Sequence, residues 1–371
     1  MKKLLFISSE FPPGPGGIGN HAWNLCKELN VCYRIDVLTV SNYVTQVEFE
    51  QFDQKQNFYV YRFKNYLSSI KTYYYRISDI ATHIKKNNYS YCILSGKFSL
   101  FCSFLIRFFS KEIKIIGVFH GSELLPKSIL INQILNYCLK KINIYISVSN
   151  YTNNLIPIKL NEKSNRFIIP NGLNINWKKN YSINNNLNIS GIPSLLTVGS
   201  ITNRKGQINM IKALPKIIQN YPNIHYHCVG LNLESKGLID IAKELNIEDY
   251  ISLHGFVPNE QLFSIYKKVN ILIMLSQNND VSSVEGFGIS ILEANLFGIP
   301  AIGSINTGIE DSIQDGKTGV LVNPYSSRDI LDAIDFVLNN QKRLSNNAIK
   351  WAKMHNWKDI GKKYSSVLEN A

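Results

Sequence analysis

Short apolar runs rich in β-branched and aromatic residues alternate along the whole chain with segments of helical periodicity. Near-continuous apolar runs separated by helical segments are typical of parallel strands that are buried on both faces of a sheet. We expect strands at residues 4–8, 35–40, 59–63, 91–95, 113–120, 144–149, 167–170, 194–200, 225–230, 251–255, 271–276, 300–304 and 319–323. Two such series predict an α/β protein with two doubly wound, Rossmann-like domains.

An asparagine-rich segment with few apolar positions, residues 174–193, separates the two series of strands. It is typical of a linker and predicts a domain boundary near residue 180. A chain of 371 residues is long enough for two cores of roughly 150 to 200 residues each. We therefore expect domains at 1–180 and 181–354, followed by a final segment, 355–371, with a helical pattern and no later strand.

Composition excludes a largely disordered chain, because 45% of the residues are hydrophobic and 11% aromatic. The net charge of +13 lies entirely in the first half, where residues 1–180 hold 23 Lys and Arg against 10 Asp and Glu. A basic domain favours an anionic partner such as a phosphate-rich ligand or a membrane surface, and the alternative is a lysine-rich surface that only aids solubility. We expect no nucleic-acid partner, because no binding module of that kind accompanies the charge.

Cysteine usage and the apolar runs indicate a cytoplasmic protein. The six cysteines form no C-x-x-C pair, and we expect them to be buried, reduced thiols. The apolar run at the N-terminus is too short for a signal peptide, which needs roughly 7 to 15 residues, so we expect a first core strand there. No run reaches the roughly 18 to 20 apolar residues of a membrane span.

Candidate chemistry lies in the loops that follow strands, where open α/β sheets bind their ligands. The glycine-rich loop at 11–19 precedes a helical pattern that begins near Ile18, which is the outline of an anion site but matches no dinucleotide or Walker fingerprint. His120 ends another predicted strand and could donate a hydrogen bond or act as an acid or base, the alternative being a structural histidine. Arg204 and Lys205 lie in a turn before a helix and predict a diphosphate site, the alternative being a solvated basic turn.

Two glutamates, Glu285 and Glu293, lie eight positions apart in "EGFGISILEA". On one helix they would be about 80° apart, but Ser282–Gly288 has the composition of a loop, and the helical pattern starts near Ile289. We therefore expect Glu285 in the loop and Glu293 in the second helical turn, touching different parts of one ligand that lies over the helix N-terminus.

Taken together, these motifs resemble the retaining glycosyltransferases of family 4. "EGFGISILEA" is similar to that family's signature of two glutamates separated by seven residues, and "FPPGPGGIG", "PNGLN", "NRKG" and "TGIEDSIQDGKTGVLVNP" follow the family's order over nearly the whole chain. Members similar to bacterial mannosyltransferases have the most similar first loop. The resemblance implies a GT-B fold, with an acceptor-binding first domain, a donor-binding second domain and a final helix that packs back on the first.

The resemblance also implies a role for each matching residue. Lys205, helped by Arg204, would bind the diphosphate of a nucleotide sugar, while Gly17 would approach its β-phosphate. Glu285 would bind the donor sugar hydroxyls and Glu293 the ribose. His120 would contact the donor sugar from the other domain. The remaining donor-binding positions would be Ser200, Gly255, Phe256, Gly286, Phe287, Gly288 and Ile289.

Two positions depart from the family pattern. Ser200 stands where an arginine is common, and we expect Arg204 to supply that charge. The family's glycine pair reads Thr307-Gly308, with Glu310 where proline is common. These departures affect the expected phosphate and sugar contacts and leave the reaction class unchanged.

The implied reaction transfers a hexose or N-acetylhexosamine from GDP-mannose or a UDP-sugar, with retention and without a metal, to a glycan or lipid-linked acceptor of bacterial surface polysaccharide. The chain has no D-x-D metal-binding pair. The basic, aromatic segments 62–86 and 98–114 could contact anionic headgroups or simply cover the sheet. A sugar-nucleotide epimerase of the same architecture is the alternative activity.

Overall fold

The computed structural model describes residues 1–14, 16–41, 45–126, 128–157, 165–176, 189–278 and 284–370. The chain divides into two compact units: unit 1 comprises Met1–Gly172 with Trp357–Ala371, and unit 2 comprises Leu173–Asn356. The predicted boundary near residue 180 and the predicted loop residue Ser282 lie outside the described residues.

Unit 1 contains a seven-stranded parallel sheet with the order β3-β2-β1-β4-β5-β6-β7. Its strands are β1 (Lys3–Ser8), β2 (Arg34–Val40), β3 (Tyr59–Phe63), β4 (Tyr89–Ser95), β5 (Lys114–Phe119), β6 (Ile144–Ser147) and β7 (Asn165–Ile168). Its helices are α1 (Gly17–Leu29), α2 (Gln46–Asp53), α3 (Ser69–Lys86), α4 (Lys97–Phe109), α5 (Ile129–Leu139), α6 (Asn150–Asn154) and α13 (Trp357–Glu369).

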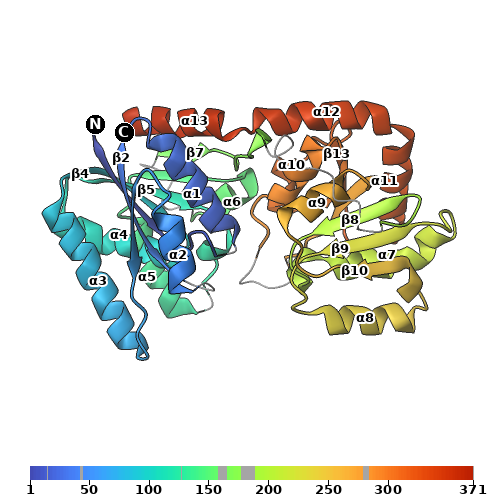
Figure 1. Cartoon of the computed structure of the whole chain (residues 1–371), viewed down its shortest axis with the longest axis horizontal. Helices are drawn as coiled ribbons and strands as arrows, with labels where there is room; N and C mark the ends of the chain where they lie inside the picture. Colours follow the sequence, from blue (N-terminus) through green and yellow to red (C-terminus); the bar gives the residue numbers. More distant parts are fainter. Residues whose placement is uncertain are drawn as a thin grey trace. The chain divides into compact units, whose positions relative to one another are not determined.

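Both faces of the unit 1 sheet are covered, as the continuous apolar strands require. Along β1, Leu4 and Phe6 join a core with α1 and α13, whereas Leu5 and Ile7 join a second core with α3, α4 and α5 (Figure 1). Helices α1 and α13 approach closely at Gly361, where an added Cβ would lie 2.5 Å from the Cβ of Glu28. The C-terminal helix is therefore an integral part of the unit 1 core.

Unit 2 contains a six-stranded parallel sheet with the order β10-β9-β8-β11-β12-β13. Its strands are β8 (Ser194–Val198), β9 (His225–Val229), β10 (Ile251–Leu253), β11 (Ile271–Met274), β12 (Ala301–Ser304) and β13 (Gly319–Val322). Its helices are α7 (Gln207–Ile218), α8 (Ser235–Glu244), α9 (Asn259–Tyr266), α10 (Ile289–Leu296), α11 (Ser327–Asn339) and α12 (Gln341–Met354).

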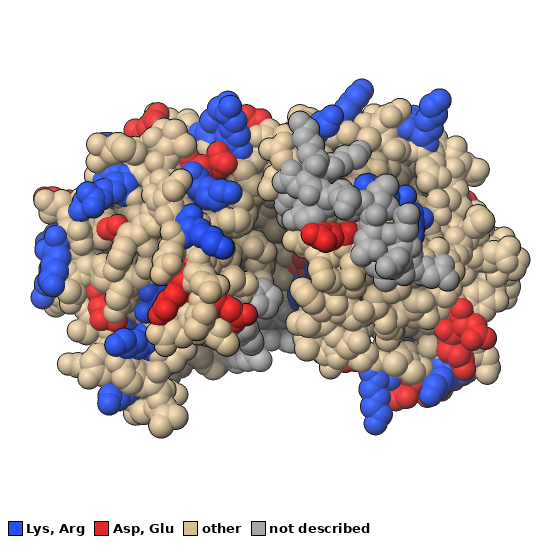
Figure 2. All heavy atoms as spheres, viewed as in Figure 1, with Lys and Arg blue, Asp and Glu red and all other residues tan. Residues whose placement is uncertain are grey.

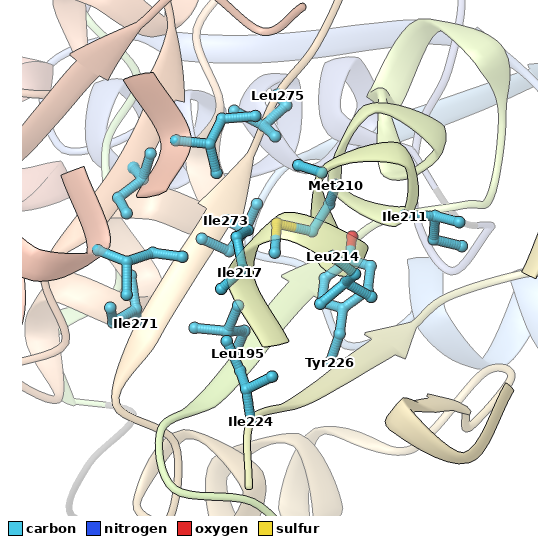
Figure 3. Packing of buried hydrophobic residues seen from close by; sticks show 14 of the residues in the cluster. Leu195, Met210, Ile211, Leu214, Ile217, Ile224, Tyr226, Ile271, Ile273 and Leu275 are labelled. Atoms are coloured by element: carbon cyan, nitrogen blue, oxygen red, sulfur yellow. The ribbon is translucent and has the colours of Figure 1, made fainter. Parts of the chain in front are cut away.

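The core of unit 2 also has two layers. Met210, Leu214 and Ile217 of α7 pack against Leu195 and Ile273 of the central strands (Figure 3). On the other face, α9 and α10 bury their apolar sides against Leu196, Leu272 and Met274. Burying one such leucine or isoleucine side chain contributes about 1.5 to 3 kcal/mol, so these layers hold the helices against the sheet.

The predicted secondary structure is confirmed. Each expected strand is present with its ends within two residues of the expected positions, and the helical patterns near Ile18 and Ile289 begin at Gly17 and Ile289. The expected strand at 194–200 ends earlier, at Val198, because Gly199 has a φ of 145° and turns the chain out of the sheet. One cysteine prediction is wrong: Cys32 is exposed in the turn before β2, while the other five are buried and all six are free. No helix in the described part of the chain is both long and apolar enough to cross a membrane.

Candidate functional site

The candidate site in unit 2 is built at the carboxyl ends of the central strands β8 and β11. The turn η4 (Asn203–Lys205) follows β8 and is held against the chain after β11, where the backbone N–H of Gln277 donates to the carbonyl of Arg204 at 2.9 Å. Gly206 has a φ of 70°, and a Cβ there would lie 1.7 Å from the carbonyl oxygen of Leu275. This close approach places Arg204 and Lys205 beside the loop that carries Glu285.

Two cationic side chains converge on the Glu285 carboxylate. Lys205 Nζ lies 2.9 Å from Glu285 Oε2, and Arg204 Nη1 donates a hydrogen bond to the same oxygen. Burial alone would raise the pKa of Glu285, but the charges and hydrogen bonds of Lys205 and Arg204 outweigh it and hold the pKa below its usual value. The carboxylate is 8% exposed and stays ionised, and the group retains one net positive charge.

Glu293 has the opposite electrostatic environment, although it is also a glutamate of the same site. It lies in the second turn of α10, partly buried, and its Oε2 accepts a hydrogen bond of 3.1 Å from Tyr266 Oη. Burial raises the pKa of Glu293 to about 7, against the lowering effects of the Tyr266 hydroxyl and the Lys205 charge. Glu293 is therefore partly protonated near neutral pH, and the charge of Lys205 lowers the pKa of both glutamates.

Backbone N–H groups at the start of α10 complete this side of the site. Gly288 has a φ of 82° and precedes the helix without a side-chain cap. The N–H of Ile291 donates to the carbonyl of Gly288 at 3.0 Å, so the first-turn N–H groups that can meet a ligand are those of Ile289 and Ser290. A Cβ on Gly308 would lie 2.1 Å from the carbonyl oxygen of Gly286, and the N–H of Gly308 donates to the carbonyl of Glu285 at 2.9 Å. The Phe287 side chain is 2% exposed and belongs to the core, so only its backbone can meet a ligand.

The two positions that depart from the family pattern both take part in local hydrogen bonds. Ser200 directly follows the Gly199 turn, and its carbonyl accepts a hydrogen bond of 3.2 Å from Gln207 Nε2. The Thr307 hydroxyl accepts a hydrogen bond from the N–H of Ile309 at 3.3 Å and caps the turn that carries Gly308. Arg204 does reach the site, where its guanidinium binds Glu285.

Gly255 and Phe256 lie at the same edge of the sheet, after the outer strand β10. The N–H of Gly230 donates to the carbonyl of Gly255 at 2.9 Å, and the Phe256 side chain is 72% exposed. Just before them, His254 Nε2 lies 3.0 Å from Nδ1 of His227 on β9. An exposed aromatic ring held beside a sheet edge is suited to stacking on a planar ligand.

In unit 1, the glycine-rich loop holds a carboxylate at the point where the sequence predicts an anion site. Gly17 begins α1, and a Cβ on Gly16 would lie 2.1 Å from Glu10 Oε2. Burial raises the pKa of Glu10, and a hydrogen bond from the backbone N–H of Gly19 partly opposes it. The positive end of α1 is thus partly compensated by a side chain of the protein itself.

His120 is the second predicted residue of unit 1, and it lies directly after β5. Its Nε2 is 3.0 Å from Ser95 Oγ, and its backbone N–H donates to the Glu123 carboxylate. Burial lowers the pKa of His120 to about 4, so the imidazole is neutral at pH 7. The ring can therefore donate or accept a hydrogen bond but carries no charge there.

Sequence reasoning did not find several of these partners. Tyr266 lies on α9 and meets Glu293 only because both helices cover the same face of the sheet. Glu10 follows strand β1 and Ser95 ends strand β4, so their place at the carboxyl edge of a predicted strand was the available signal. Nothing in the sequence pattern distinguishes His21, which α1 places against the His120 ring.

Comparisons with known proteins agree with this architecture. A family model described as glycosyl transferases group 1 matches residues 180–354, and one described as glycosyltransferase family 4 matches residues 15–177. The D-inositol 3-phosphate glycosyltransferase of Corynebacterium aurimucosum is 25% identical over 183 residues, which are 47% of this chain and 42% of that protein. The GDP-mannose-dependent α-(1-6)-phosphatidylinositol monomannoside mannosyltransferase of Mycolicibacterium smegmatis is 26% identical over 169 residues, 44% of each chain.

These matches span less than half the length of both relatives. Among solved structures, the fold is similar to that of Anabaena Alr3699/HepE in complex with UDP and glucose, with a TM-score of 0.81, 17% identity and coverage of 100% of both chains. The two family models together account for most of the chain, and the paired parallel sheets have the architecture of that neighbour. The chain belongs to the glycosyltransferases that these two models describe, family 4 over residues 15–177 and group 1 over residues 180–354, and it has the GT-B fold.

Proposed function

We propose that the protein is a retaining glycosyltransferase that moves a hexose or N-acetylhexosamine from a nucleotide diphosphate sugar to a glycan or lipid-linked acceptor, in the synthesis of a bacterial surface polysaccharide such as lipopolysaccharide O-antigen, capsule or exopolysaccharide. The observation that carries the proposal is the meeting of Lys205 and Arg204 on buried Glu285, beside the uncapped N-terminus of α10. In this proposal unit 2 binds the donor and unit 1 binds the acceptor.

Each charged group has one task in donor binding. Lys205 and Arg204 supply counter-charges to the diphosphate, together with the N–H groups of Ile289 and Ser290 at the start of α10. Glu285 accepts hydrogen bonds from the sugar hydroxyls, and its two cations keep it ionised for that task. Glu293 accepts from the ribose hydroxyls, which favours its ionised form and lowers its pKa when donor binds.

The departing diphosphate develops negative charge in the transition state. Without a metal, that charge must be stabilised by Lys205, Arg204 and the helix N–H groups. Glu285 is paired with both Lys205 and Arg204, and in this proposal its carboxylate binds sugar hydroxyls rather than forming a glycosyl enzyme. We therefore propose attack of the acceptor on the same face from which the diphosphate leaves, with the acceptor proton passing to the leaving phosphate oxygen.

The covalent alternative has a direct test. We expect Glu285→Gln to lose most turnover without accumulating a modified protein, because Glu285 holds the sugar and forms no bond to it. Intact-protein and peptide mass spectra of wild type and Glu285→Gln, taken after incubation with donor, provide the measurement. A glycosyl adduct at residue 285 of the wild type would contradict same-face attack.

Activity assays distinguish sugar transfer from epimerisation of the donor and test whether the reaction needs a metal ion. Nucleoside diphosphate should appear only when both donor and acceptor are present, whereas an epimerase would convert the donor sugar with no acceptor. Turnover should survive EDTA, since Lys205 and Arg204 supply the counter-charge. Loss of activity in EDTA that Mg²⁺ or Mn²⁺ restores would contradict metal independence.

The donor is a GDP-mannose or a UDP-sugar in this proposal. The relative from Mycolicibacterium smegmatis is named as GDP-mannose-dependent, and the Anabaena neighbour was solved with UDP and glucose. A thermal-shift panel of GDP- and UDP-sugars distinguishes them, because a ligand at 100 times its dissociation constant stabilises the protein by about 2.7 kcal/mol.

A lipid-linked acceptor would bring unit 1 to an anionic membrane surface. On the face of unit 1 that Figure 2 shows, the described basic side chains are interspersed with acidic ones, so charge alone defines no docking surface there. Helix α3 has Lys71 in its first turn and Lys85 and Lys86 in its last, and Lys140 directly follows α5. Both helices have exposed apolar side chains along their length: Ile70, Tyr73, Tyr74, Ile77, Ile129, Leu130, Ile134 and Tyr137. Apolar residues flanked by lysines fit a headgroup region better than water.

Vesicle flotation tests this docking surface. We expect binding to vesicles that contain anionic lipid, weakened by salt and by the double change Tyr74→Ser with Leu130→Ser. Binding that is indifferent to salt and to anionic lipid would contradict the electrostatic part of the proposal.

A further inference from the structure

Two buried side chains from different elements contact His120 in unit 1, and a third supports one of them. Ser95 ends β4, is fully buried, and places its Oγ 3.0 Å from His120 Nε2. His21 of α1 is 1% exposed, and its ring centroid lies 4.9 Å from that of His120 at an interplanar angle of 80°. Behind His21, Tyr364 of α13 is fully buried, with its Oη 3.4 Å from His21 Nε2.

The protonation of this cluster follows from burial. Burial lowers the pKa of His120 to about 4 and that of His21 well below its usual range, with the neighbouring His120 adding to the effect on His21. Each neutral imidazole has one N–H and one acceptor nitrogen, so near pH 7 the choice of tautomer decides what His120 can offer a ligand.

The Ser95 hydroxyl fixes that choice. Among the described residues, Ser95 Oγ has His120 Nε2 as its hydrogen-bond partner. If Nε2 carried the proton, the hydroxyl hydrogen of Ser95 would be left in the interior without an acceptor, which is unfavourable. Ser95 therefore donates to Nε2, and the proton of His120 is on Nδ1.

The position of the His120 ring depends on His21. The edge-to-face packing of the two rings limits rotation of His120, and His21 is itself held by Trp357 and Tyr364 of α13, with ring centroids 5.2 and 6.0 Å away. His21 Nδ1 has no hydrogen-bond partner among the described residues, so packing rather than hydrogen bonding is the main restraint on this ring.

We propose that Ser95 and His21 are positioning residues for His120: Ser95 keeps the proton on Nδ1, and His21 keeps the ring in the plane from which Nδ1–H donates to a sugar hydroxyl. The inference rests on the proposed function for the role of that hydrogen bond. The tautomer and ring position are properties of unit 1 that can be measured without turnover.

Nitrogen NMR of the full-length protein labelled at histidine tests the tautomer directly. The signals of His120 are assigned with His120→Gln. We expect wild type to show the Nδ1–H form and Ser95→Ala to show a mixture of both forms, because the hydroxyl donor is gone. Ser147→Ala is the matched control: Ser147 ends the nearby strand β6, is equally buried, and its hydroxyl has no partner among the described residues. An Nε2–H form in wild type, or an unchanged pattern in Ser95→Ala, overturns the assignment.

Kinetics tests whether the position matters. We expect Ser95→Ala to lower kcat about tenfold, the effect of one neutral hydrogen bond, with the donor KM changed less. His21→Ala should lower kcat by a similar factor, because the His120 ring loses the side chain that packs against it. Ser95→Thr should recover turnover because it keeps a hydroxyl, and His21→Phe should recover it because it keeps the packed ring. Melting temperatures of all variants distinguish positioning from unfolding. Failure of both conservative variants to rescue, with melting temperatures like wild type, overturns the proposal.

The same experiments separate this inference from the proposed function. Wild-type protein that transfers no sugar with any donor and acceptor, yet shows the expected tautomers in the NMR arm, would defeat the proposed function and support the positioning of His120. If the wild type is active but Ser95→Ala leaves the tautomer of His120 unchanged, the inference is wrong and the proposed function stands.

Discussion

The two units hold their buried polar groups by different interactions. Unit 2 gathers full charges, with Arg204 and Lys205 on the Glu285 carboxylate and Glu293 nearby. Unit 1 gathers neutral groups around His120, held by one hydroxyl and a packed ring. Charges suit a group that must meet an anion, whereas neutral groups can direct a hydrogen bond without the desolvation cost of a buried ion.

The largest effect is expected from a substitution that removes a charge from unit 2. Lys205→Met should lower kcat/KM by about 100- to 1,000-fold, because it removes one of the two cations that we propose for the leaving diphosphate. Steady-state kinetics with varied donor is the measurement, and Lys212→Met, an exposed lysine of α7, is the control. Equal activity of both variants would show that Lys205 belongs to a solvated turn.

The next effect tests the neutral character of unit 1. His120→Ala should lower kcat/KM by roughly 10- to 100-fold, because one directed hydrogen bond is lost. Since the pKa of His120 is about 4, this residue should contribute no titration to the pH profile between pH 6 and 8. A kinetic pKa near 6.5 that disappears in His120→Ala would contradict the neutral cluster.

A third prediction separates the two glutamates by pH. The folded pKa of Glu293, about 7, lies above its ordinary value of 4.5, so its contribution to stability is fully present below pH 4.5 and is lost as the pH rises through 7. Glu285 acts in the opposite direction: its pKa is lowered, so its contribution is present above pH 4.5 and is lost as the pH falls through the lowered value.

Urea unfolding between pH 5 and pH 8 measures the contribution of Glu293. The free energy of unfolding of the wild type should fall by about 2 kcal/mol from pH 5 to pH 8 through Glu293, an order of magnitude set by the size of the pKa shift. In Glu293→Gln this fall should be absent. A wild type and a Glu293→Gln variant with parallel pH dependence would contradict the raised pKa.

The smallest expected effect concerns Tyr266. Its hydroxyl lowers the pKa of Glu293, so Tyr266→Phe should shift that titration upward and weaken donor binding by about 1 kcal/mol. Calorimetric titration of donor at pH 6 and pH 8 measures both changes. Tyr250→Phe, a tyrosine of the same unit away from α10, serves as the control.

Much of the fold could be predicted from the sequence. Strand positions followed from buried apolar runs, because a parallel strand covered on both faces needs apolar side chains on both. The separation of Glu285 from Glu293 also followed, since Gly286 and Gly288 interrupt helical periodicity before Ile289. The position of Arg204 and Lys205 in a turn directly before a helix was also predicted.

Other features could not be predicted, because they join residues distant in sequence. Tyr266 meets Glu293 across two helices, and Tyr364 reaches His21 from the far end of the chain. The position of Glu10 at the start of α1 depends on the turn at Gly16, which brings the carboxylate to Gly19. Exposure of Cys32 likewise depends on where the turn before β2 meets solvent.

By itself, the sequence determined two series of buried strands and the loops in which glycines, cations and carboxylates lie. Only the tertiary structure decided which charges meet. Glu285 and Glu293 are chemically identical and eight positions apart, yet the pKa of one is lowered and that of the other is raised. The physical reason is that burial opposes both charges, while two cations held by the turn after β8 reach Glu285, and Glu293 receives chiefly a neutral hydroxyl from α9.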